Sequence, residues 1–135
     1  MNNQMQITTE YLLAGSSEVS VPELKRLTRS ADAAVRARVA ENIVTPIGSL
    51  LRLLNDESGE VRLSLSHNKA LPSIFLAQLA HDRDVDVRYG MAENPNLSAS
   101  ILRTLLTDEN PYVADRAEQT LLRIAATETL VKSVA

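Results

Sequence analysis

A 26-residue repeat is the feature that most restricts what this 135-residue chain can fold into. Three segments, residues 33–54, 59–80 and 85–106, align in one register without an insertion. The columns that recur at this step are Val35, Val61, Val87 and Val113; Arg36, Arg62 and Arg88; Asn42, Asn68 and Asn94; Leu24, Leu50, Leu76 and Leu102; and Leu27, Leu53, Leu79 and Leu105. Repeats of this length are typical of arrays in which each copy is one supersecondary unit stacked on the next.

The register extends towards both ends of the chain, where the columns decay. Ala114 replaces the repeated Arg, Thr120 replaces the Asn, and Glu128 stands where a Leu is expected. Terminal units of a stack carry one exposed face and diverge for that reason. We therefore expect a single repeat domain over residues 1–135 with two degenerate outer caps, built from units at about 6–31, 32–57, 58–83, 84–109 and 110–135.

The first half of each regular unit has the pattern of an α-helix. It opens at an acid-rich turn, whose side chains can cap the helix and complement its dipole. Apolar residues four apart, such as Val35 with Val39 and Val87 with Met91, then form one stripe. We expect this helix to end at the Asn column, because Asn tolerates the left-handed conformation that often terminates a helix.

The second half of each unit predicts a shorter helix. It opens near Pro46, Pro72 or Ser98 and carries the repeated leucines. Only about ten residues are available for it, so the helix is short, and 3₁₀ geometry is an alternative to α. No sustained period-two alternation competes, and the chain is predicted to be an all-α, right-handed solenoid. The last unit lacks the Asn and Pro break, which predicts one long capping helix from residue 111 to about 131.

The segment DVDVRYGMAENPNLSASILRTLLTDENPYV resembles the units of the leucine-rich repeat variant family, and nearly the whole chain follows that pattern. It is also similar, more loosely, to HEAT-type α-solenoids. The resemblance implies α-helices alternating with short helices, often 3₁₀, in a right-handed superhelix. Some members of the family carry an iron–sulfur cluster on an added Cys-rich segment. This chain contains no Cys, so that property is not expected here.

Composition and motifs argue against several classes of function. Without Cys, disulfides and thiolate chemistry are excluded. No nucleotide-binding or nucleophile motif is present, and His67 and His81 have no second His at ligand spacing, so we expect no enzyme, no cofactor and no metal. No apolar run approaches membrane length and the first residues lack a secretory pattern, which favours a cytoplasmic protein without a membrane partner.

Two polar ladders follow the repeat, and each allows two interpretations. Arg36, Arg62 and Arg88 can bind an anion, or they can pair with the turn residues Asp56, Asp82 and Asp108, which share their period. The pairing is favoured because it belongs to the repeat rather than to one place in it. The Asn ladder can hold a peptide backbone or cap the first helices, and capping is favoured.

The predicted second helices carry more basic than acidic residues, and the 26-residue repeat does not account for this. The cations there are Lys25, Arg26, Arg29, Arg52 and Arg103, whereas Glu23 is the only acid before the closing turns. In HEAT-like solenoids the second helices usually line the concave side. Two interpretations stay open: an ordinary solvated face, or a groove for an acidic protein segment or a phosphate backbone.

The function expected from these features is a non-catalytic interaction module that binds a partner protein or peptide on the second-helix face. Nucleic-acid binding by the same face is the alternative, disfavoured by the net charge of −3 and the absence of Trp. Self-association through an end of the array is a third possibility, so the chain is expected to be a monomer or a weak homodimer.

Overall fold

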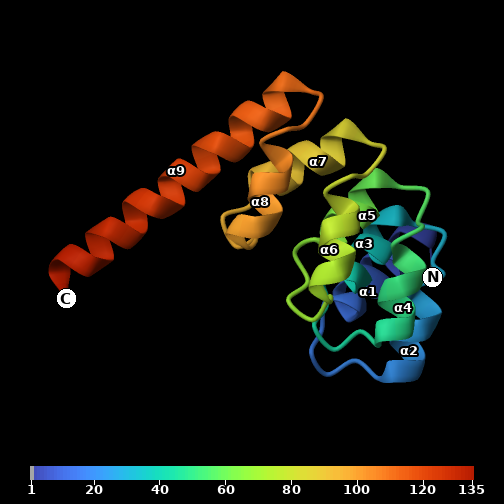
Figure 1. The fold of residues 1–135 in the computed structure, drawn as a ribbon. Coiled ribbons are helices and arrows are strands. Elements are labelled where there is room, and N and C mark those ends of the chain that lie inside the picture. Colours follow the sequence, from blue (N-terminus) through green and yellow to red (C-terminus); the bar gives the residue numbers. More distant parts are fainter. Residues whose placement is uncertain (1) are drawn as a thin grey trace. The chain divides into compact units, whose positions relative to one another are not determined.

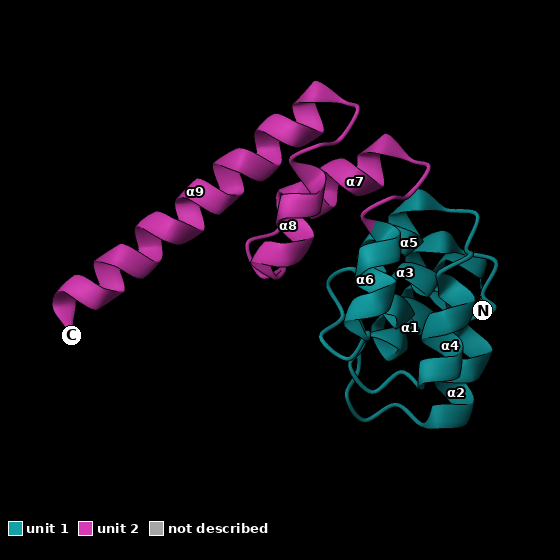
Figure 2. Ribbon diagram, in the orientation of Figure 1, with its two compact units in different colours: residues 1–79 teal, residues 80–135 magenta. Residues whose placement is uncertain are grey.

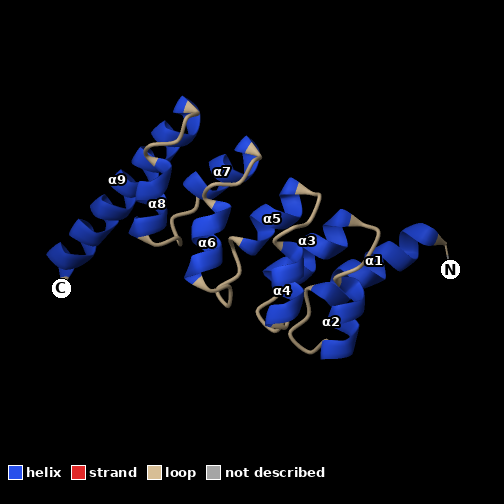
Figure 3. Cartoon of the chain, turned by 45° about the vertical axis from the view of Figure 1, so that its right-hand side comes forward, coloured by secondary structure: helices blue, strands red, loops and turns tan. Residues whose placement is uncertain are grey.

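The computed structural model of the chain describes residues 2–135, and within that range it consists of helices and connecting turns without a strand (Figures 1 and 3). The all-α prediction is confirmed, and so is the long final helix. The helices of the described residues are α1 (Asn3–Ala14), α2 (Val21–Leu27), α3 (Ala33–Glu41), α4 (Ile47–Leu53), α5 (Gly59–Leu65), α6 (Ser73–Leu79), α7 (Val85–Ala92), α8 (Ala99–Leu105) and α9 (Pro111–Val134). No helix in this range combines the length and the apolar character that a membrane span requires.

The helices group into two compact units, residues 1–79 and residues 80–135 (Figure 2). In the first unit α3 packs against both α1 and α5, while α2 contacts α1 and α3, and α4 contacts α3 and α5. In the second unit α7, α8 and α9 pack against one another.

The apolar stripes predicted from the sequence form the core of each unit. Val35 and Val39 of α3, and Val61 and Leu65 of α5, have no exposed surface. Burying an aliphatic side chain of this size contributes roughly 1.5–3 kcal/mol, so these stripes are a major source of stability. Leu76 is the exception among the repeated leucines, being only half-buried, because α6 packs less closely against the other helices of its unit than α2 and α4 do.

Side-chain caps begin α3, α7 and α9 at equivalent positions of the 26-residue pattern, whereas Ser58 before α5 makes no such bond. Asp32 accepts a hydrogen bond from the N–H of Ala34 at 2.8 Å, and Asp84 accepts one from Asp86 at 2.9 Å. Asn110 starts α9 in the same way. Such caps satisfy N–H groups that the helix itself leaves unpaired, each for about 1 kcal/mol. The acid-rich turns therefore set where the helices begin.

The short second helices are α-helices rather than 3₁₀-helices. In α4 the N–H of Leu50 bonds to the carbonyl of Pro46, and the N–H of Leu54 bonds to that of Leu50, each spanning four residues. Three-residue bonds occur where the helix ends, as between the N–H of Asn55 and the carbonyl of Arg52. Pro46 before α4 and Ser98 before α8 adopt extended backbone conformations, which start the helix without interrupting it.

Candidate functional site

The basic residues expected to bind a partner lie on three different helices and their ends. Lys25 and Arg26 belong to α2, and Arg29 follows the end of that helix. Arg52 lies in the last turn of α4, and Arg103 lies in the last turn of α8. All five side chains are exposed. Arg103 is in the second unit, so the cations that the structure brings together are those of α2 and α4.

A groove of about 410 Å³ runs between α2 and α4 and is called the α2–α4 groove below. Its lining residues are Lys25, Thr28, Arg29, Pro46, Gly48, Ser49 and Arg52. Three of these seven side chains are cationic and none is acidic. Within the described residues, Lys25, Arg29 and Arg52 make no ion pair or side-chain hydrogen bond. The groove is therefore a local centre of positive charge in a chain of net charge −3.

A larger hollow of about 830 Å³ adjoins the groove and shares Thr28, Arg29, Gly48 and Arg52 with it. Asp56 and Glu57 line this hollow together with Arg29 and Arg52. Asp56 is buried against Arg36, whereas the side chain of Glu57 is 93% exposed. Carboxylates thus bound the positive region on that side and confine it to the groove itself.

Arg26 has a different environment from the other cations of α2. Its guanidinium binds Glu23 at 2.7 Å and Glu10 of α1 at 3.0 Å. The hydrogen bonds to Glu23 and to Glu10 raise the pKa of Arg26, and the one from Arg26 lowers the pKa of Glu23. Arg26 is therefore occupied by partners within its own unit, and its charge is largely balanced.

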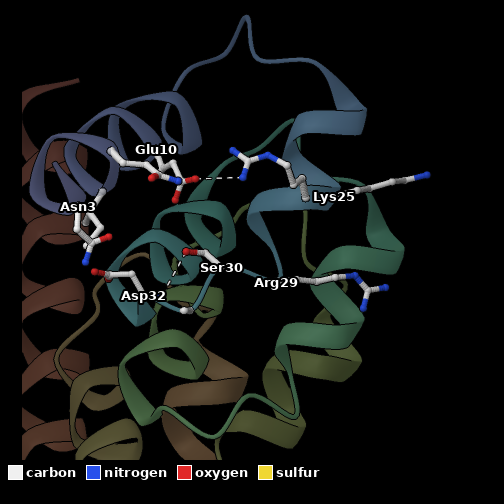
Figure 4. A pocket seen from close by; sticks show the side chains of 10 residues that line it. Asn3, Glu10, Lys25, Arg29, Ser30 and Asp32 are labelled. Atoms are coloured by element: carbon white, nitrogen blue, oxygen red, sulfur yellow. Dashed lines mark hydrogen bonds and ion pairs between the residues drawn. The ribbon is translucent and has the colours of Figure 1, made fainter. Parts of the chain in front are cut away.

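A second hollow of about 740 Å³ lies on the α1 side of α2, where Lys25, Arg26 and Arg29 line it together with Glu10 and Asp32. Figure 4 shows Glu10 and Asp32 on this side, with Glu10 joined to Arg26. The Lys25 and Arg29 side chains project in the opposite direction, away from these carboxylates (Figure 4). Their charged ends are thus directed away from the acids of this hollow.

The Arg ladder joins successive turns. Arg36 binds Asp56 through Nε at 2.8 Å and through Nη2 at 3.0 Å, and its Nη1 donates to the carbonyl of Ser30 at 2.8 Å. In the second unit Arg88 repeats this geometry with Asp108 and the carbonyl of Asp82. The Nη1 group of Arg62 donates likewise to the carbonyl of Asp56. The structure thus supplies Arg36 and Arg88 with an internal anion.

These ion pairs shift the pKa of the two carboxyl groups. Burial pushes the pKa of Asp56 upwards, but the hydrogen bonds from Arg36 and from the N–H of Ser58 outweigh it and hold that pKa below its ordinary value. Asp108 has a lowered pKa for the same reasons, with Arg88 and the N–H of Asn110 as donors. Both carboxylates are ionised at neutral pH. Each accepts hydrogen bonds from an Arg side chain and from a backbone N–H of its own turn.

Within the first unit, Asn42 and Asn68 of the Asn ladder reach back to carbonyls of the preceding segment, whereas Asn94 accepts a hydrogen bond from the N–H of Asn96 at 2.9 Å. The Nδ2 group of Asn68 donates to the carbonyls of Ala40 at 2.8 Å and Asn42 at 3.0 Å, and its Oδ1 accepts from the N–H of Ala70 at 2.8 Å. Asn42 makes the corresponding bonds to residues of α1 and its following turn. These side chains are buried, so they hold neighbouring backbones together rather than presenting donors to a peptide.

Asn42 ends its helix by a different conformation from the one expected. Its φ of −74° and ψ of 119° are extended, so the predicted left-handed conformation is wrong at this position. Within residues 2–135 no residue other than Gly has a positive φ. The helix stops because the Asn side chain accepts from the N–H two residues later and replaces the helical partner of that group.

Sequence analysis did not identify Ser49 and Gly48 as groove residues, nor Glu10 as the partner of Arg26. A signal for the first two exists in the repeat itself. The positions 26 residues after Gly48 and Ser49 hold Ile74 and Phe75. The repeat that contains α4 thus carries two small residues where the next repeat carries large ones. Nothing comparable marks Glu10, because the first 26-residue repeat, about residues 6–31, lacks most of the recurring residues.

The histidines lie outside the groove, and neither belongs to a metal cluster. His67 is exposed, with its Nδ1 at 3.2 Å from the carbonyl of Leu63. His81 is exposed and lines a hollow of the second unit near Asp108. Among residues 2–135, no group of three or more His, Asp or Glu side chains has an arrangement that could hold a metal ion.

Comparisons with family models, with curated proteins and with solved structures find no match to this chain.

Proposed function

We propose that this chain is a non-catalytic interaction module that binds an acidic segment of a partner protein on its second-helix face. The proposal includes a right-handed α-solenoid of about five 26-residue units, with the resemblance to the leucine-rich repeat variant family. It is supported by bonds that recur at this spacing, such as those of Asn42 and Asn68 to carbonyls 28 residues earlier. In such an array the second helices form the concave face on which partners bind.

The observation that carries the proposal is the charge of the α2–α4 groove. Lys25, Arg29 and Arg52 face it with no carboxylate in its lining and no internal ion pair among the described residues. By contrast, Arg26, Arg36 and Arg88 are paired with acids of the chain itself. Cations that the fold leaves without a counter-charge can steer and bind an anionic partner. An acidic side chain of a partner segment matches the sign of this groove.

Aromatic placement favours a protein over a nucleic acid. Proteins that bind single strands stack bases on exposed aromatic rings inside a basic channel. The α2–α4 groove has no aromatic residue in its lining. Tyr112 is 76% exposed but lies in α9 of the second unit, and the Tyr89 ring is engaged by Arg116. A phosphate backbone would thus find charge in this groove but no stacking surface.

Fluorescence anisotropy with a labelled Glu-rich peptide tests the proposed function. The double variant Arg29→Glu with Arg52→Glu should weaken binding by at least about tenfold, because two attractions become repulsions, each worth more than about 1 kcal/mol. The matched control is Arg123→Glu with Lys132→Glu, which makes the same charge change on exposed positions of α9. Equal losses in the two double variants would show that binding follows net charge and would reject the groove.

The same proposal covers partners and assembly. The module acts in the cytoplasm as a monomer or a weak homodimer, without a cofactor. Light scattering measures the assembly state directly, and a stable higher oligomer at micromolar concentration would contradict this part.

A further inference from the structure

Ser49 is a buried polar residue whose hydroxyl group has no partner in the described structure. It is 8% exposed and lines the α2–α4 groove. Two other buried hydroxyl groups of the first unit have a partner: Thr28 donates to the carbonyl of Leu24 at 2.7 Å, and Thr45 donates to that of Val39 at 2.8 Å. The Ser49 hydroxyl is not among the fully buried side-chain atoms that lack a partner, so it retains contact with solvent. It makes no hydrogen bond within the described residues and can donate to an acceptor that enters the groove.

The cations around Ser49 indicate what kind of acceptor this is. Lys25 and Arg29 come from the end of α2 and Arg52 from the last turn of α4, so they approach the groove from both walls. Together with Ser49 they supply three positive charges and a hydroxyl donor. A carboxylate carries one charge, whereas a phosphoryl group carries about −1.5 to −2 at neutral pH and three acceptor oxygens. The donor set matches the phosphoryl group better.

We propose that the α2–α4 groove binds the phosphoryl group of a phosphorylated Ser or Thr in a partner protein. The inference rests on the proposed function, since it names which anion of the acidic segment the groove recognises. Lys25, Arg29 and Arg52 form charge-assisted hydrogen bonds with the phosphoryl oxygens, and the Ser49 hydroxyl donates to one of them.

The surroundings of the groove favour one phosphoryl group over a chain of them. Asp56 and Glu57 line the larger hollow that adjoins it, and Glu10 and Asp32 line the hollow on the other side of α2. A nucleic acid carries a charge at every nucleotide and would meet these carboxylates as it left the groove. A peptide with a single phosphorylated residue places its charge in the groove and neutral residues at the borders.

Gly48 offers a way to close the site without disturbing the fold. A Cβ atom built on Gly48 would meet nothing within 4 Å, so larger side chains are accommodated there. Gly48→Glu would place a carboxylate in the groove lining, four residues before Arg52 on the same helix, where the two side chains pair. Gly48→Ala keeps the groove charge unchanged and is the matched control.

The experiment uses the full chain and three fluorescein-labelled pools of short peptides with randomised flanks, measured by fluorescence anisotropy. The central residue is phosphoserine, serine or glutamate. The phosphoserine pool should bind at least about tenfold more tightly than either other pool, because it gains charge-assisted bonds that they lack. Ser49→Ala should weaken this binding several-fold and Gly48→Glu should abolish it, whereas Gly48→Ala should leave it unchanged. Circular dichroism verifies that every variant is folded.

Each other outcome overturns a defined part of the argument. Equal affinity for the phosphoserine and glutamate pools would refute the phosphoryl site and leave the acidic-segment function standing. Failure of all three pools to bind would refute both. A labelled oligothymidylate, measured in the same assay, tests whether the groove binds a nucleic acid instead. If it alone binds, and Gly48→Glu releases it, the groove serves a nucleic acid and the phosphopeptide proposal is wrong.

Discussion

Asn68 offers the most direct test of what holds the first unit together. Asn68→Ala removes the two bonds from Nδ2 to Ala40 and Asn42 and the bond from the Ala70 N–H. Asn68 is 2% exposed, so water does not replace these bonds freely. At about 1 kcal/mol for each lost bond, the variant should lose about 3 kcal/mol of unfolding free energy. Urea unfolding followed by far-ultraviolet circular dichroism measures this loss.

A graded series at the same position separates the bonds from the loss of volume. Thr120 lies two 26-residue steps after Asn68 and donates to the carbonyl of Ala92 at 2.6 Å, which corresponds to the Asn68 bond to Ala40. Asn68→Thr should therefore keep one bond and lose only about 2 kcal/mol. Asn68→Asp should be worse than Asn68→Ala at neutral pH, because its buried carboxylate would face two carbonyl oxygens.

The control is Lys69→Ala, an exposed neighbour whose change should stay within about 0.5 kcal/mol. A loss of less than about 1 kcal/mol for Asn68→Ala would refute the assignment of stability to these bonds. The same conclusion would follow if Asn68→Thr and Asn68→Ala were equally destabilised, since the retained hydroxyl would then contribute nothing.

Three further predictions follow from the ion pairs, the glycine of α4 and the final helix. The folded-state pKa values of Asp56 and Asp108 are lowered, so the unfolded chain takes up protons first; stability should be level above about pH 5 and fall below about pH 4. Urea midpoints across that range should fall less steeply when both residues are changed to Asn. Gly48→Ala should raise the unfolding free energy by about 0.5–1 kcal/mol in thermal melts, because its methyl group meets open space. Deleting residues 126–135, which are exposed throughout, should cost less than about 1 kcal/mol in urea unfolding, and a larger loss would reveal an unrecognised contact.

The parts of the fold that could be predicted are those that depend on periodicity. Val35, Val61 and Val87 recur at one step and are all buried, because each occupies the same place in the apolar stripe of its own helix. The starts of the second helices follow Pro46 and Ser98 as expected, since these residues enter a first turn easily.

The parts that could not be predicted depend on distances between segments far apart in the chain. The Asn column was visible, but the carbonyls that it reaches lie 26 and 28 residues earlier, and no local rule points to them. The Arg26 charge was visible too, whereas its neutralisation by Glu10 required knowing how α1 packs beside α2. The sequence therefore predicts the set of cations. Only the structure shows that Arg26 is paired with acids of the chain, whereas the cations of the groove are not.

The bonds of the Arg and Asn ladders have a consequence for how such a chain can change length during evolution. Asn68 donates backwards to a carbonyl of the preceding segment, and Arg36 donates forwards to Asp56 in the turn that follows. In the first unit, the segments that contain Asn42 and Asn68 therefore each carry the donor that the preceding carbonyls accept. A gene rearrangement that inserts or removes a whole 26-residue segment there leaves these bonds with matching partners, whereas a shift of one residue breaks them. Tandem duplication in steps of 26 residues is thus the route that this chemistry permits.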